Sequence, residues 1–192
     1  MGITTEEFFQ NVYNVMFSPK DFFENENINS SVRLAIGVIS AMTAINKLAY
    51  AIADNSISGW TFIFSLIWSV IFSVLMWFII ALFFEYMAKI FDRGGNLSRL
   101  LYLSSFAAIP TLFFAPLNLL KQIGEFGYIL SVVFGCLLYC WIVILYAYAV
   151  KNTYKITLAR AFMLIFLPLI SSILAIYQIV GFYHKMWYIF SI

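Results

Sequence analysis

The sequence predicts an all-α, polytopic membrane protein: a five-transmembrane-helix bundle with short amphipathic N-terminal helices. Composition is the first indication, because 64% of the 192 residues are hydrophobic and only 10% are charged. A soluble domain is nearer half apolar and about a quarter charged. The mean hydropathy of +0.93 is the second indication. The third is a series of five apolar segments, each close to the ~20 residues that a helix needs to cross a bilayer.

Residues 1–31 are expected to form a cytoplasmic amphipathic segment with two short helices. Thr4 and Glu7 fit a capping box at the start of the first helix. Ser18 as the N-cap and Pro19 at the first helical position predict the start of the second. Apolar residues at helical spacing favour two helices that lie on the membrane surface. The alternative is that they pack under the bundle.

Residues 32–181 are expected to form the membrane domain with its five spans. The short, aromatic C-terminal tail at 182–192 is expected to rest at a membrane interface, because Trp and Tyr favour that position. The predicted spans are Val32–Ala53, Trp60–Phe84, Leu100–Leu120, Tyr128–Val150 and Ala161–Gly181.

The distribution of Lys and Arg predicts the orientation of the chain. Two basic residues precede or open the first span, and the second and fourth loops each hold three, whereas the other side of the membrane receives three in total. The positive-inside rule therefore places the N-terminus in the cytoplasm and the C-terminus outside. The residues on the first side are Lys20, Arg33, Lys89, Arg93, Arg99, Lys151, Lys155 and Arg160, and those on the other are Lys47, Lys121 and Lys185.

Two prolines interrupt the third span. Proline removes a backbone donor and clashes with the preceding turn, so a helix bends or breaks there. Broken backbone persists in lipid only where other groups satisfy its carbonyls, so this span is expected inside the bundle. The prolines form either a simple kink or a discontinuous helix that lines a small polar cavity, as in many transporters. The residues concerned are Ser104, Ser105, Pro110, Thr111, Pro116 and Asn118.

The cytoplasmic ends of the spans carry a candidate docking patch. Glu85 closes the second span, and Lys89 follows it at the favourable i, i+4 spacing. We expect Glu85 to face Arg93, Arg99 or Arg160 and to hold two loops together. The basic residues serve either topology and lipid headgroups or an acidic partner. The patch comprises Glu85, Arg93, Arg99, Lys151, Lys155 and Arg160.

Small residues on the first span predict close helix contact. Gly37, Ala41 and Ala44 allow backbones to approach, either within the bundle or in a homodimer. On the fourth span, Cys136 and Cys140 lie on one helical face, where packing is a better explanation than a metal site.

Several classes of function are excluded. His184 is the only histidine, so an HExxH metal site cannot form. The sequence holds no GxSxG element and no phosphate-binding glycine loop, and no carboxylate pair falls inside a span. No catalytic residue, cofactor or metal is therefore expected. The absence of a polybasic run argues against nucleic acid.

Three elements in order resemble the Yip family, the Ypt/Rab-interacting proteins. They are SPKDFF before the first span, KIFDRGGNLSRLLYLSSFAAIP after the second, and KNTYKITLARA leading into the fifth. The most specific piece is the pair Gly94 and Gly95, followed by Arg99 and Pro110. The likeness covers roughly residues 5 to 181. It implies five spans with a cytoplasmic N-terminus.

The resemblance also suggests a function. Eukaryotic relatives act in vesicle traffic around Rab GTPases, and some microbial relatives are linked to transport systems. This chain lacks the long N-terminal region of many eukaryotic members, which argues against a small GTPase partner and for a microbial-type protein in a plasma membrane. We expect a non-enzymatic protein that acts through lipids or a membrane-protein partner in membrane organisation, trafficking or assembly. The alternatives are an accessory subunit of an ABC-type or other transporter, and a small solute transporter.

Overall fold

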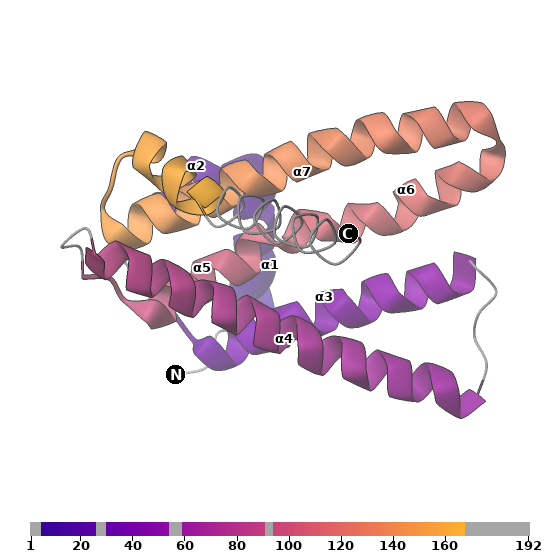
Figure 1. Ribbon diagram of the computed structural model, residues 1–192, viewed down its shortest axis with the longest axis horizontal. Helices are drawn as coiled ribbons and strands as arrows, with labels where there is room; N and C mark the ends of the chain where they lie inside the picture. The colour runs from indigo at the N-terminus through magenta and orange to yellow at the C-terminus, as the bar shows by residue number, and fades with distance from the viewer. Residues whose placement is uncertain (1–4, 26–29, 54–58, 91–93, 168–192) are drawn as a thin grey trace, which may run out of the picture.

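The long helices of the protein lie side by side along one direction (Figure 1). The computed structural model describes residues 5–25, 30–53, 59–90 and 94–167. Helix α3 (Val32–Ala53) packs against α4 (Gly59–Ile90) as the first pair. Helix α4 is apolar on all sides and contacts α3 and α5 over only part of its surface. Most of α4 is therefore free to face lipid.

The third span is built from several pieces. Helix α5 (Leu97–Ala107) leads into the 3-10 turn η1 (Ile109–Phe113), and α6 (Phe114–Leu120) follows. The turn contains Pro110, and its first hydrogen bond runs from Thr111 N–H to the Ala108 carbonyl at 2.9 Å. A 3-10 turn of this kind satisfies carbonyls that the proline would leave unpaired.

A second helical pair follows the third span. The short 3-10 turn η2 (Lys121–Ile123) ends at Gly124, whose φ of 96° only glycine adopts readily. Helix α7 (Glu125–Tyr154) then runs back along α6 and past α5. A shorter apolar helix, Leu158–Leu167, comes after a turn. The chain thus places the end of α4, the start of α5 and the end of α7 at one end of the bundle, which we name the polar end (Figure 1).

The two N-terminal helices, α1 (Thr5–Phe17) and α2 (Pro19–Glu24), cross the direction of the long helices (Figure 1). As predicted, Pro19 occupies the first position of α2, but Ser18 makes no side-chain cap bond and accepts only through its carbonyl, from Phe22 N–H. Both helices contact the bundle, α1 through α5 and α2 through α7, and their expected place on the membrane surface stays a prediction. Thr4 of the predicted capping box lies outside the described residues.

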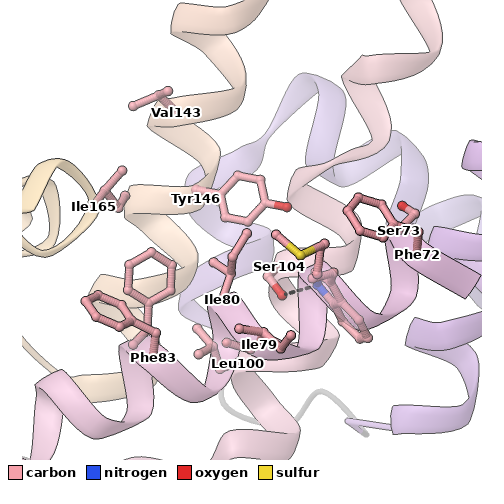
Figure 2. Close-up of a pocket in the computed structure, with 14 residues that line it drawn as sticks. Phe72, Ser73, Ile79, Ile80, Phe83, Leu100, Ser104, Val143, Tyr146 and Ile165 are labelled. Carbon is pink, nitrogen blue, oxygen red and sulfur yellow. Dashed lines mark hydrogen bonds between the residues drawn. The ribbon is translucent and has the colours of Figure 1, made fainter. Parts of the chain in front are cut away.

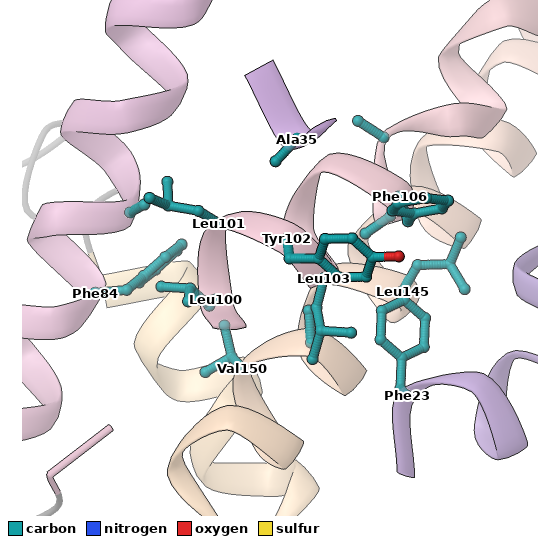
Figure 3. Packing of buried hydrophobic residues seen from close by; sticks show 14 of the residues in the cluster. Phe23, Ala35, Phe84, Leu100, Leu101, Tyr102, Leu103, Phe106, Leu145 and Val150 are labelled. Atoms are coloured by element: carbon teal, nitrogen blue, oxygen red, sulfur yellow. The ribbon is translucent and has the colours of Figure 1, made fainter. Parts of the chain in front are cut away.

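Helix α5 occupies the centre of the core. Every residue from Leu100 to Ala107 is buried. The buried share of the most apolar stretch differs between the spans. It is 61% in the third span, and 28%, 11% and 17% in the first, second and fourth. The prediction that the other helices shelter the third span is therefore confirmed. Figure 3 shows side chains from four other helices gathered around α5: Phe23 of α2, Ala35 of α3, Phe84 of α4, and Leu145 and Val150 of α7.

The predicted all-α membrane architecture is confirmed over the described residues. In the part of the chain that the structure describes, four helices are long and apolar enough to cross a membrane. The first begins and ends as predicted, whereas α4 and α7 are longer than their predicted spans because they continue into the polar end. The predicted fifth span is described only as far as Leu167. Its continuation to Gly181 and the predicted tail 182–192 lie outside the described residues.

The structure corrects the expected role of Pro116. This residue is the third of α6, within the first helical turn. The first four N–H groups of a helix have no partner inside it, so a proline there costs no hydrogen bond. The interruption of the third span is therefore confined to Ala108–Phe113 and centred on Pro110.

Candidate functional site

At the polar end, a buried tyrosine joins α7 to α4. The hydroxyl of Tyr154 donates to Glu85 Oε2 at 2.8 Å, and Tyr154 is 1% exposed. Lys89 Nζ lies 3.7 Å from the other carboxylate oxygen, so the predicted i, i+4 pair is confirmed. Among the described residues, Glu85 thus contacts Tyr154 and Lys89, whereas the expected partner Arg93 lies outside the described residues. A carboxylate at this depth needs such donors, because an unpaired buried charge is costly.

The same tyrosine explains one of the two adjacent glycines. A Cβ built on Gly95 would lie 2.1 Å from Cε1 of the Tyr154 ring, whereas Gly94 has no neighbour within 4 Å of that position. Gly95 therefore allows the loop before α5 to lie directly on the ring. The two glycines therefore differ. Gly95 is needed where the loop meets the Tyr154 ring, and Gly94 lies in open space.

Two further contacts attach α2 to the polar end. Lys151 Nζ lies 3.1 Å from Glu24 Oε1 and 5.6 Å from the centroid of the Tyr148 ring. Arg99, expected near Glu85, donates from Nη2 to the carbonyl of Asn25 at 3.2 Å. Beneath them, Phe22 and Phe23 are buried among the core residues. Basic residues of the predicted patch thus hold α2 in place.

The remaining patch residues lie at the surface. Lys155 is exposed and is the C-cap residue that follows α7. Its backbone is in the left-handed region, with φ 51°. The N–H of Ile156 donates to the Lys151 carbonyl, which completes a Schellman-type end. Arg160 is exposed on the Leu158–Leu167 helix. Arg93 lies outside the described residues.

The residues expected to line a polar cavity at the third span lie in different surroundings. Ser104 accepts from Trp77 Nε1 at 2.9 Å and donates to the Leu101 carbonyl, and Ser105 donates to the Tyr102 carbonyl at 2.7 Å. Both serines are therefore satisfied within the core. Thr111 and Asn118 are only partly buried, and Asn118 Nδ2 has no hydrogen-bond partner. The predicted cavity residues do not converge on a common polar space.

A cavity of about 760 Å³ does open beside α5, between α4, α7 and the Leu158–Leu167 helix. Figure 2 shows the residues that line it, with the Trp77–Ser104 bond at its wall and the Tyr146 ring extending across it. Nearly all of its lining is apolar, as in Phe72, Ile80 and Phe83. Such a lining suits hydrocarbon and offers a polar solute few partners.

The small residues of α3 do not mediate helix packing among the described residues. Gly37 and Ala41 are exposed, and no atom lies within 4 Å of a Cβ placed on Gly37. Ala44 is partly buried. The core side of α3 instead carries Ala35, Val38, Ile39 and Met42. Of the two alternatives for this spacing, the homodimer stays a prediction.

Four residues that hold the site together were not predicted as site residues: Tyr154, Trp77, Tyr102 and Asn11. A general signal was available for the aromatic ones. A Tyr or Trp buried in a core finds a hydrogen-bond partner for its polar atom. Their positions in the sequence could not reveal which partner each would find.

Comparison with known protein families matches residues 13–179 to the Yip1 domain. The chain belongs to the Yip family. The match extends from within α1 to beyond the last described helix, so it includes the whole polar end and the broken third span. Comparisons with curated proteins and with solved structures found no match. The Yip-family chain is therefore an integral, multi-pass membrane protein with an all-α architecture over its described residues.

Proposed function

We propose that this Yip-family protein is a non-enzymatic membrane adaptor. It acts through contacts with another membrane protein, or with lipids, in membrane organisation, trafficking or assembly. The observation that carries the proposal is that the two serines expected to line a polar cavity, Ser104 and Ser105 of α5, are buried and hydrogen-bonded inside the core. A transporter would need polar groups turned toward a path through the bilayer.

The docking surface is the exposed part of the polar end. Because Glu85, Arg99 and Lys151 are occupied in contacts within the chain, they position helices rather than meet a partner. Lys155 and Arg160 are basic side chains exposed at the surface. In the orientation that the basic residues predict, this surface faces the cytoplasm. An acidic partner segment fits it best.

Site-specific photocrosslinking in native membranes tests the proposal. A benzophenone amino acid at Arg160 is expected to capture one discrete protein partner. The matched control is Leu75, an exposed residue of α4 that should meet only lipid. A second experiment places the probe at Lys155 and compares a chain with the native Arg160 with one that carries Arg160→Glu. The charge reversal should lower the yield of the adduct captured from position 155.

The identity of the captured protein separates the candidate roles. A transporter subunit would favour the accessory role, and a trafficking component would favour membrane traffic. If Arg160 yields no protein adduct beyond that from Leu75, the proposed contact with a membrane-protein partner is wrong.

A further inference from the structure

Helix α1 has three distinct sides. Successive residues of an α-helix are turned by ~100°. Phe8, Asn11 and Val15 therefore share the side that faces the core, where Val15 is fully buried and Asn11 Nδ2 donates to Tyr102 Oη at 3.1 Å. Phe8 lies 6.0 Å from Phe106, centroid to centroid. These contacts with α5 fix how α1 is rotated about its own axis.

The second side of α1 is an exposed aromatic stripe. Phe9, Tyr13 and Phe17 follow one another at i, i+4 and i+8, and they are 64%, 60% and 71% exposed. The rings of Tyr13 and Phe17 lie 4.7 Å apart. The third side is polar and contains Glu7 and Asn14, whereas Glu6 and Gln10 lie beside the stripe, seven residues before Tyr13 and Phe17 respectively. A helix that is attached sideways to a protein, with one apolar and one polar flank, is suited to a membrane–water boundary.

The depth of α1 agrees with such a boundary. It contacts α5 at Tyr102 and Phe106, which follow the charged Arg99 by three and seven residues. At ~1.5 Å per residue these positions lie about 5 and 10 Å deeper in the span than Arg99. Interfacial helices place their apolar face about 5–10 Å into the headgroup and acyl boundary. Figure 1 also shows α1 lying across the spans, as a helix in the plane of the membrane would.

We propose that Phe9, Tyr13 and Phe17 insert into the lipid leaflet at the polar end, in the same membrane that the spans cross. Helix α1 is thus a lipid-contacting helix held rigidly on the third span, whereas α2 is part of the core. A second copy of the chain is a poorer occupant. Three partly exposed rings offer roughly 400 Å² of surface. A stable protein interface takes about 800 Å² from each partner.

Spin-label accessibility in the full chain tests this proposal. Cys136→Ala and Cys140→Ala provide a background for single cysteines at positions 9, 13 and 17, in vesicles of phosphatidylethanolamine and phosphatidylglycerol. Glu7 is the matched polar control, because it is exposed on the polar side of the same helix. Leu75 is the lipid reference and Arg160 the water reference. The ratio of oxygen to nickel-chelate accessibility at 9, 13 and 17 should resemble that at 75 and exceed that at 7 several-fold.

Two outcomes would overturn the proposal. Nickel accessibility at 9, 13 and 17 equal to that at Arg160 would place the stripe in water. Protection from both reagents would mean that a protein surface covers it. If a labelled variant fails to fold, trifluoromethyl-phenylalanine at the same positions keeps an aromatic ring, and its ¹⁹F signal can be broadened by the same two reagents.

Discussion

At the residue scale, Gly95 carries the closest packing constraint near the polar end. A methyl group there would overlap the ring of Tyr154, which is itself buried and bonded to Glu85. The ring cannot turn away without giving up that bond. The contact thus links the glycine to the carboxylate of another helix.

We predict that Gly95→Ala lowers the free energy of unfolding by about 1–3 kcal/mol, as overpacking a tight contact does. Gly94→Ala is the matched control, because that position is exposed and open. Thermal unfolding of the two variants in detergent measures the difference. Equal midpoints for both variants would contradict the close approach of Gly95 to Tyr154.

At the element scale, the Glu85–Tyr154 bond joins the ends of α4 and α7, which otherwise contact each other little. We predict that Tyr154→Phe destabilises the protein by about 1.5–3 kcal/mol, the range for a hydrogen bond to a charged group. Glu85→Gln should cost less, because the amide oxygen still accepts from the hydroxyl.

A double-mutant cycle in thermal or chemical unfolding measures the coupling between these two residues. The reference is Lys89→Ala, which removes the i, i+4 ion pair of about 0.3–0.5 kcal/mol, in which Lys89 is the exposed partner. The cycle uses Glu85→Ala, which removes the acceptor, and additive effects of Glu85→Ala and Tyr154→Phe would show that the two side chains do not act together.

The elements were largely predictable, and the contacts at the site were not. The length of the apolar segment predicted both ends of α3 correctly. Asn96 caps α5, because its side chain accepts a hydrogen bond from Arg99 N–H. Pro116 was misjudged because its effect depends on where the next helix begins. The partners of Glu85 depend on how far α7 extends past Val150, which hydropathy alone does not reveal.

At the scale of the whole molecule, the α6–α7 turn and the polar end lie at opposite ends of the bundle (Figure 1). The orientation of the chain in the membrane can therefore be tested. We predict that the α6–α7 turn faces outside and the polar end faces the cytoplasm. In the background without Cys136 and Cys140, cysteines at Ile123 and Arg160 suit a labelling experiment, since both positions are exposed. A membrane-impermeant maleimide should reach 123 and not 160 in intact cells.

Lysed cells provide the control, in which both positions should react. Tyr154 is unsuitable for this purpose because it is buried. Reaction at 160 in intact cells, with none at 123, would reverse the predicted orientation.

The central place of α5 has a consequence for biogenesis. The ribosome delivers α5 before α7, although α7 supplies much of the surface that covers α5. Until α7 emerges, Ser104 and Ser105 lack part of the enclosure that shields them from hydrocarbon. We therefore expect the nascent third span to stay beside the insertion machinery, and to enter the bilayer together with its successor rather than by itself.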